Sequence, residues 1–224
     1  MTHTLTLQRK EQLTPDTHRY VFDKPEGLEF DAGQATELTL MKDGWRDEPR
    51  PFTFTSLPDE NALEFVIKSY PDRDGVTEKL AKLEAGDTVE VKAPFGAISD
   101  HGPGVFIAAG AGITPFIPIL EKHAEAGKMD CTLIFTNETE EDVILREKWE
   151  KMDGLTTIFT VTDEDDTGAK VKEQKVDKAF LKENLTRFDQ TFYICGPQGF
   201  VNDVRDALKD LGADADKIVT EEGW

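Results

Sequence analysis

Hydrophobic and polar residues alternate in short runs over the first 98 residues, a pattern that predicts β-strands. Turn-forming clusters such as TPD, KDG, LPDEN and EAGD separate the runs. The predicted strands cover residues 2–10, 18–24, 35–42, 51–57, 63–70 and 87–94. One helix is expected at 75–83, where Val76, Leu80 and Leu83 recur at helical spacing. This half therefore predicts a small antiparallel barrel or sandwich.

From residue 104 the pattern changes to continuous apolar runs that alternate with helical segments. Strands are expected at 104–110, 130–137, 155–162 and 190–196, and helices at 114–127, 140–152, 175–185 and 197–212. Apolar strands joined by helical crossovers are typical of a parallel sheet covered on both faces. The chain is therefore expected to have two domains, an antiparallel β-barrel at 1–99 and a doubly wound α/β domain at 104–224.

Charge and length narrow the class of protein. The 224 residues carry 45 acids and 26 bases, a net charge of −19, which opposes binding to nucleic acid. No apolar run is long enough to span a bilayer and the N-terminus lacks a signal peptide's order, so a cytoplasmic protein without stable membrane insertion is expected. Cys131 and Cys195 lie in apolar runs without metal-ligand spacing, so no metal site is expected.

A glycine turn at 107–115, IAAGAGITP, is the sharpest local motif. Gly110 and Gly112 stand where an apolar strand gives way to a helix, and such a turn lets backbone amides approach a phosphate. Pro115 stands where the third glycine of the dinucleotide fingerprint would be. Glycine turns of this kind also close plain α/β units, so both interpretations are open.

A second turn, CGP at 195–197, follows the last strand of the α/β half. The carboxyl ends of parallel strands lie on one edge of a sheet, and ligands of open α/β sheets bind at that edge. The turn is therefore expected beside Gly110 and Gly112. The alternative for Cys195 is a small buried hydrophobe.

The barrel half contributes an arginine at the head of RPFTFTS, residues 50–56. The guanidinium of Arg50 suits a phosphate, Phe52 offers a flat apolar face and Thr53 a hydroxyl. Alternatively, Arg50 pairs on the surface with Asp47 or Glu48.

The helix expected at 75–83 starts in the segment RDGVTEKL with a glycine, followed two residues later by a threonine. Gly75 and Thr77 form an anion site at a helix start, or Thr77 is a simple cap.

Taken in order, RPFT, GVT, GAGITP and CGP resemble the pattern of the ferredoxin–NADP reductase superfamily of flavoproteins over nearly the entire chain. The resemblance implies that Arg50 and Thr77 hold the flavin phosphates, that Phe52 packs on the isoalloxazine and that Thr53 bonds near its N5 edge. Phe52 replaces the usual tyrosine, which removes a hydroxyl contact. FAD is the expected flavin in preference to FMN.

On the other domain, the resemblance implies that Gly112 and Thr114 meet the nicotinamide nucleotide and that 195–197 flanks the nicotinamide. The expected cofactor-binding set is Arg50, Phe52, Thr53, Ile67, Lys68, Ser69, Gly75, Val76, Thr77, Gly110, Gly112, Thr114, Asn137, Cys195, Gly196, Pro197 and Trp224. After the strand at 130–137, Asn137 and Glu138 stand where a reader of a 2′-phosphate would carry a base, which favours NADH over NADPH although Arg146 is near.

The C-terminal IVTEEGW fits the same family, in which a terminal aromatic or acid often reaches the flavin. Trp224 would cover the ring, and Glu222 or Glu221 would pass protons; the alternative is a frayed tail. The expected catalytic residues are Thr53, Cys195 and Glu222, with Thr53 and Cys195 positioning the reacting atoms.

The resemblance implies hydride transfer from NADH or NADPH to FAD, and then single-electron transfer to a separate acceptor. Ferredoxin, flavodoxin, another soluble protein or a small molecule would serve, and Lys68, Arg73, Lys79 and Lys82 are the candidate docking patch for an acidic partner. A non-catalytic nucleotide-binding electron-transfer or regulatory subunit with the same fold is the alternative. A Rossmann dehydrogenase without flavin is disfavoured, because it leaves Arg50 without a ligand.

Overall fold

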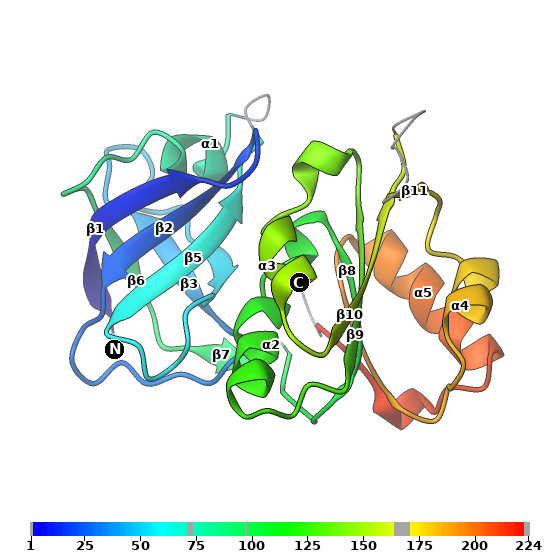
Figure 1. The fold of residues 1–224 in the computed structure, drawn as a ribbon. Coiled ribbons are helices and arrows are strands. Elements are labelled where there is room, and N and C mark those ends of the chain that lie inside the picture. Colours follow the sequence, from blue (N-terminus) through cyan, green and yellow to red (C-terminus); the bar gives the residue numbers. More distant parts are fainter. Residues whose placement is uncertain (1, 71–73, 97, 164–170, 222–224) are drawn as a thin grey trace.

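The computed structural model describes residues 2–70, 74–96, 98–163 and 171–221. An antiparallel sheet and a parallel sheet lie side by side, each made by one half of the chain (Figure 1). Both fold classes predicted from the sequence are confirmed.

The N-terminal half forms a seven-stranded sheet in the order β4-β3-β6-β1-β2-β5, with β7 paired to β3. Thr55 N donates to Glu64 O at 2.8 Å, so the chain after β4 lies against β5 and nearly closes the sheet into a barrel. Apolar side chains alternate inward and fill the barrel, and Phe54 packs between Phe30 and Phe65. The elements are β1 (His3–Gln12), β2 (Thr17–Asp23), β3 (Gln34–Leu40), β4 (Arg50–Thr53), β5 (Ala62–Lys68), α1 (Val76–Leu80), β6 (Thr88–Val91) and β7 (Phe95–Gly96).

The C-terminal half forms a six-stranded parallel sheet in the order β11-β10-β9-β8-β12-β13. Helices α2 and α3 cover the face toward the barrel and α4 and α5 the outer face (Figure 1). The elements are β8 (Gly104–Ala109), η2 (Gly110–Ile113), α2 (Phe116–Glu125), β9 (Cys131–Asn137), η3 (Glu140–Asp142), α3 (Arg146–Lys151), β10 (Leu155–Val161), β11 (Lys172–Glu173), α4 (Lys178–Asn184), β12 (Thr191–Cys195), α5 (Gln198–Asp210), η5 (Ala215–Lys217) and β13 (Ile218–Thr220).

Two segments differ from the sequence prediction. The single helix expected at 140–152 is wrong, because the chain forms η3, turns, and starts α3 only at Arg146. Leu145 adopts a left-handed φ of 57°, which a continuous helix does not allow. Residues 218–220 were expected in the tail, but they form β13, which pairs with β12. The rest of the expected tail, with Glu222 and Trp224, lies outside the described residues.

One of the apolar clusters contains residues of both halves. Ala32 and Val66 of the barrel and Ile98 of the connection belong to the same buried cluster as α2 and the sheet. The connection is also hydrogen-bonded to the α/β half, since His101 N donates to Tyr193 Oη at 2.8 Å and that hydroxyl donates to Gly102 O at 2.8 Å. These contacts set the barrel against the carboxyl edge of the parallel sheet.

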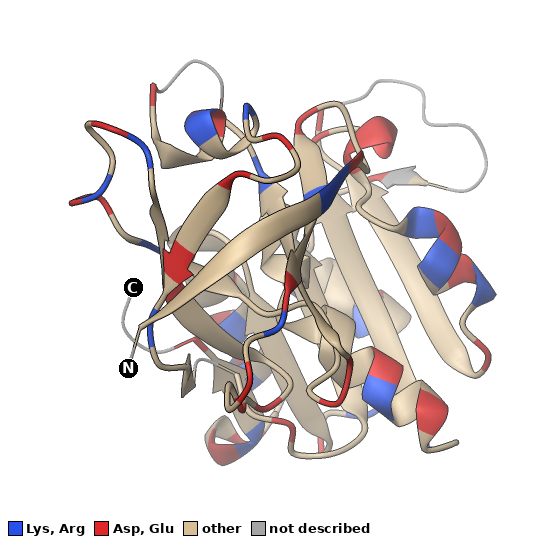
Figure 2. Ribbon diagram, turned by 90° about the vertical axis from the view of Figure 1, so that its left-hand side faces the viewer, with Lys and Arg blue, Asp and Glu red and all other residues tan. Residues whose placement is uncertain are grey.

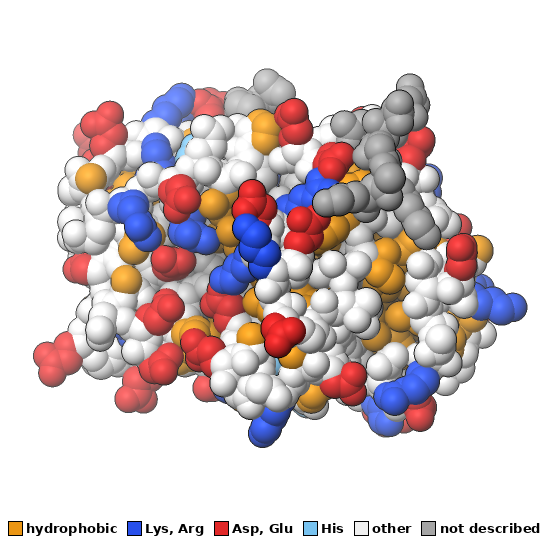
Figure 3. All heavy atoms as spheres, viewed as in Figure 1, with side chains coloured by type: hydrophobic (Ala, Val, Ile, Leu, Met, Phe, Trp, Pro, Cys, Tyr) orange, Lys and Arg blue, Asp and Glu red, His pale blue; other side chains and the backbone are white. Residues whose placement is uncertain are grey.

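Acidic side chains are spread over the surface with bases among them, as the views of the charged residues show (Figures 2 and 3). Within the ranges given above, no helix is both long and apolar enough to cross a membrane.

Candidate active site

A cavity of about 660 Å³ lies between the barrel and the carboxyl ends of the parallel strands. It is lined from the barrel by β4, β5 and α1, and from the other half by the ends of β8, β9, β10 and β12. The cavity has the size of a small-molecule or cofactor site. Twelve residues of the set expected from the sequence line it: Phe52, Thr53, Ile67, Lys68, Thr77, Gly110, Gly112, Thr114, Asn137, Cys195, Gly196 and Pro197.

The two ligand-type turns of the parallel sheet touch through their backbones. A Cβ atom on Gly112 would lie 2.3 Å from Cys195 O and 2.7 Å from Gly196 N, so only glycine fits there. Gly110 has a left-handed φ of 53°, the second place where the turn requires glycine. Gly110 and Gly112 both line the cavity, and neither carries a side chain that would keep a phosphate or a carboxamide away from the backbone.

Cys195, which is buried, and Glu221, which is half-buried, form a pair beside these turns. Burial raises the pKa of the Cys195 thiol well above its ordinary value, and the adjacent Glu221 carboxylate, which accepts a hydrogen bond from the thiol, raises it further. Burial also raises the pKa of Glu221, although the hydrogen bond from Cys195 opposes this. The thiol therefore stays protonated and is a positioned donor and not a nucleophile.

Glu221 lines the cavity, whereas the acid predicted to be catalytic, Glu222, lies outside the described residues. The sequence offered both acids as proton carriers and placed Glu222 among the expected catalytic residues. Glu221 comes directly after β13, and the pairing of β13 with β12 brings Glu221 to Cys195.

On the barrel side, Thr53 is buried and Phe52 is half-buried at the edge of the barrel core. Arg50 is exposed and does not line the cavity; its guanidinium donates to Glu48 at 2.9 Å and to Pro49 O at 2.8 Å. The alternative pairing with Glu48 is thus formed in this structure. A phosphate role for Arg50 stays a prediction, in which a ligand replaces Glu48.

Of the residues expected to bind the cofactor around the start of α1, Thr77 lines the cavity and its neighbours Gly75 and Val76 do not. Gly75 occupies the N-cap and no side chain caps the helix, so Thr77 is not the cap and lines the cavity instead. Val76 is buried in the barrel core, and Ser69 donates from Oγ to Thr77 O at 3.2 Å. Gly75, Val76 and Ser69 therefore support the cavity wall without lining it.

Buried polar atoms at the end of β9 have no partner within the described structure. Asn137 is 6% exposed, and neither its amide nitrogen nor its amide oxygen is hydrogen-bonded; the Thr136 hydroxyl is in the same state. Both residues line the cavity. Unpartnered buried polar atoms are costly, and a polar ligand with donors and acceptors would satisfy them. The residues present therefore fit a nucleotide.

Lysines near the cavity are held by carboxylates. Lys68 pairs with Asp16 at 3.1 Å and with Asp142 at 3.7 Å, Lys79 with Asp74 at 2.5 Å, and Lys82 with Glu78. The described part of the basic docking patch expected from the sequence therefore carries no excess of positive charge, which corrects that expectation. Arg73, its fourth member, lies outside the described residues.

Sequence reasoning gave no role to nine of the lining residues: Ala35, Pro51, Val66, Tyr70, Ala109, Ala111, Thr136, Thr162 and Phe200. Glu138 and Glu221 also line the cavity, and the sequence analysis named both outside the expected cofactor-binding set. Most of the nine directly adjoin predicted positions, such as Tyr70 after Ser69 and Thr136 before Asn137. Phe200 and Thr162 do not adjoin any predicted site residue. Only the order of the strands in the sheet brings their segments to this edge of the cavity.

Two family models together match nearly the whole chain. One, described as an oxidoreductase FAD-binding domain, matches residues 4–99, and the other, an oxidoreductase NAD-binding domain, matches residues 106–206.

Curated proteins with similar sequences are also oxidoreductases by name or flavohemoproteins. The chain is 30% identical over 216 residues to NADH-cytochrome b5 reductase 1 of Aspergillus terreus, a match that covers 87% of this chain and 72% of that protein. It is 28% identical over 205 residues to the flavohemoprotein of Bacillus subtilis, covering 85% of this chain and 50% of that protein.

Solved structures share the fold. The CS-b5R domains of human Ncb5or in an NAD⁺ form match at a TM-score of 0.84 and 27% identity, over 97% of this chain and 68% of that one. A ferredoxin NADP⁺ reductase from Neisseria gonorrhoeae with bound FAD and NADP matches at a TM-score of 0.84 and 22% identity, over 100% and 99% of the two chains. The chain therefore belongs to the ferredoxin–NADP reductase-like superfamily of flavin-dependent oxidoreductases, with FAD and a nicotinamide nucleotide as its cofactors.

Proposed function

We propose that this protein takes a hydride from NADH onto FAD and passes electrons singly to a separate acceptor. The observation that carries the proposal is the shared cavity, lined by the expected flavin residues of one half and the expected nucleotide residues of the other. Residues 1–99 would bind FAD and residues 104–224 the nucleotide. FAD, when bound, supplies the change from two-electron to one-electron chemistry.

The barrel residues would hold and orient the flavin. Phe52 offers its half-buried ring for packing, and Thr53 offers a hydroxyl from the end of β4. Thr77 and Arg50 would receive the phosphates, with Arg50 leaving Glu48. The backbone at Ile67 and Ser69 would contribute along β5, and Gly75 and Val76 at the start of α1.

The α/β residues would place the nicotinamide. Gly110, Gly112 and Thr114 would meet the nucleotide at the first turn, and 195–197 would flank the nicotinamide. The protonated Cys195, held by Glu221, would donate toward the ring's edge and orient it, and orientation of two reactants in one cavity is itself a large catalytic effect. Trp224 would cover the flavin ring and Glu222 would pass protons; both lie outside the described residues.

NADH is proposed as the donor because the nucleotide edge of the cavity is acidic. Glu138 lines the cavity, and Arg146 is held by Glu150 at 2.9 Å and by Glu140. A 2′-phosphate at this edge would meet repulsion. Asn137 supplies an unpartnered amide that suits a ribose diol or a carboxamide.

The acceptor is proposed to be a separate soluble protein, such as a ferredoxin, a flavodoxin or a cytochrome, or a small molecule. Relatives are NADH-cytochrome b5 reductases by name, and one is a coenzyme Q6 reductase. A cytoplasmic location is part of the proposal, and cell fractionation tests it.

Rapid mixing of FAD-loaded protein with NADH or NADPH in the absence of oxygen tests the proposal. Bleaching of the flavin bands by NADH, with a higher second-order rate constant than for NADPH, supports it. Retention of FAD without bleaching by either nucleotide would favour the alternative, a non-catalytic regulatory subunit with the same fold.

A further inference from the structure

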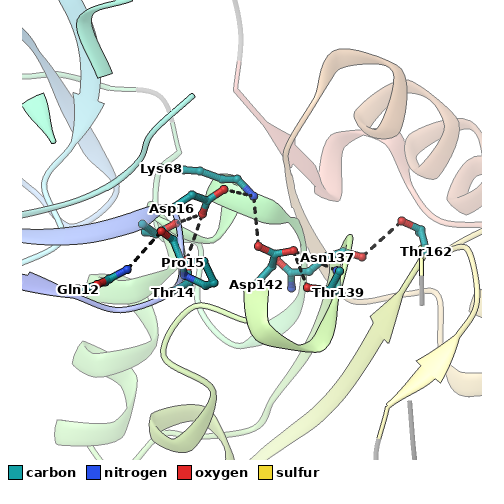
Figure 4. Close-up of polar contacts among 10 residues, drawn as sticks. Gln12, Thr14, Pro15, Asp16, Lys68, Asn137, Thr139, Asp142 and Thr162 are labelled. Carbon is teal, nitrogen blue, oxygen red and sulfur yellow. Dashed lines mark hydrogen bonds and ion pairs between the residues drawn. The ribbon is translucent and has the colours of Figure 1, made fainter. Parts of the chain in front are cut away.

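Lys68 lies at the end of β5, between the barrel and the α/β half. Its ammonium nitrogen is 3.1 Å from Asp16 Oδ2, in the turn between β1 and β2, and 3.7 Å from Asp142 Oδ1, in η3 (Figure 4). The side chains of Lys68 and Asp142 are 15% and 14% exposed. Both side chains are mostly buried, so salt screens this contact across the domain boundary less than it screens an exposed ion pair.

The Asp142 carboxylate has two separate tasks. Its Oδ2 atom accepts hydrogen bonds from Thr139 N at 3.1 Å and from Thr139 Oγ1 at 2.8 Å, and these bonds close the turn of η3 (Figure 4). Its Oδ1 atom faces Lys68. One carboxylate thus connects a loop of the α/β half to a strand of the barrel.

The loop that Asp142 closes is part of the cavity wall. Asn137 and Glu138 line the cavity at its start, and Thr162 N donates to Asn137 O at 3.1 Å while Asp163 N donates to Glu138 O at 3.0 Å. The loop 137–142 is therefore anchored at one end to the end of β10 and at the other to β5. Lys68 itself also lines the cavity.

The positive charge of Lys68 maintains its contact with Asp142. Burial acts to lower the pKa of Lys68, but the hydrogen bond and charge of Asp16 and the charges of Asp142 and Glu138 outweigh it, so the net shift is upward. Lys68 stays protonated, and the carboxylates that face it come from both halves of the chain.

We propose that Asp142 is a positioning residue, which holds the nucleotide-binding loop 137–142 against the flavin-side strand β5 through Lys68. The inference rests on the proposed function, because it assigns the loop to the nicotinamide nucleotide and β5 to the flavin. Asp142 does not line the cavity, so its effect on either ligand passes through Lys68 and the loop.

The test compares Asp142→Asn with Asp16→Asn in the FAD-loaded protein. Asparagine at 142 still accepts from Thr139 through its amide oxygen but removes the charge that faces Lys68. We expect calorimetric affinity for NAD⁺ to fall about fivefold and the rate of flavin bleaching at saturating NADH to fall about tenfold. Asp16→Asn removes the same charge from the same lysine within one domain and is expected to change both quantities less than twofold.

Two further variants separate positioning from local damage. Asp142→Glu is expected to recover most of the NAD⁺ affinity, because a carboxylate again faces Lys68. The Lys68→Met and Asp142→Asn double mutant is expected to lose no more NAD⁺ affinity than Lys68→Met alone, since both changes break the same contact. Additive losses, or equal effects of Asp142→Asn and Asp16→Asn, would overturn the proposal.

The outcome is distinguishable from failure of the proposed function. If NADH does not bleach the flavin of the unmutated protein, the proposed function fails. If NADH bleaches it but Asp142→Asn binds NAD⁺ as tightly as the unmutated protein, only the role of Asp142 is refuted.

Discussion

Gly112→Ala is expected to lower both stability and activity, because the added Cβ atom would overlap the backbone of Cys195. The added Cβ would lie 2.3 Å from Cys195 O and 2.5 Å from Cys195 C, whereas a relaxed carbon–oxygen contact is about 3.3 Å. Both neighbours are backbone atoms, so the two turns must separate by about 1 Å. Forced overpacking of this kind costs about 1–3 kcal/mol of unfolding free energy.

The functional loss is expected to exceed the loss of stability. A displacement of about 1 Å at a site that aligns two reactants lowers the rate by about a hundredfold. We therefore expect urea unfolding to show the modest destabilisation, and rapid mixing with NADH to show the large fall in flavin bleaching rate.

Gly199→Ala is the matched control, because Gly199 lies in the first turn of α5 and nothing is within 4 Å of its added Cβ. We expect it to leave the rate unchanged and to raise stability by up to about 1 kcal/mol. If Gly112→Ala unfolds at the same urea concentration as the unmutated protein and reacts as fast, the backbone contact between the two turns does not hold the site.

Three more substitutions test other parts of the molecule. Arg50→Gln is expected to weaken FAD binding about ten- to hundredfold in a fluorescence titration of the apoprotein, and unchanged affinity would mean that Arg50 serves only Glu48. Trp149→Ala is expected to cost about 3–5 kcal/mol in urea unfolding, because the indole is fully buried and donates to Ile144 O at 2.8 Å; a loss under about 1 kcal/mol would contradict this. Burial raises the pKa of Glu221, so its contribution to stability is fully present below its unfolded-state pKa near 4.5 and is lost as pH rises through the folded-state pKa. Glu221→Gln should therefore gain stability relative to the unmutated protein as pH rises above about 4.5, and a stability difference that stays constant with pH would refute the shift.

The hydrophobic pattern predicted both sheets. Strands with one buried face alternate apolar and polar residues, as in the barrel, whereas strands buried on both faces are continuously apolar, as in the parallel sheet. Thr53 and Gly112 were predicted near a ligand because each lies in a motif at the end of a predicted strand, and both line the cavity. The sequence could not show that β6 pairs with both β1 and β3, since strand order depends on contacts between distant segments.

Three features that the sequence could not establish depend on such contacts. Glu221 reaches Cys195 because β13 pairs with β12, and a three-residue strand has too weak a pattern to predict. The helix break at Leu145 arises where Asp142 closes its turn on Thr139 and Val143 and Ile144 turn into the core. The pairing of Lys68 with Asp142 joins residues that only the packing of the two halves brings together.

The central claim is that FAD bound by the barrel receives a hydride from a nucleotide held by the α/β half. The most direct test is the visible absorbance spectrum of the purified protein after loading with FAD and removal of unbound flavin, before and after NADH is added without oxygen. The account predicts flavin bands that stay with the protein and bleach when NADH is added. A protein that retains no FAD, or whose flavin bands persist with both NADH and NADPH, would contradict it.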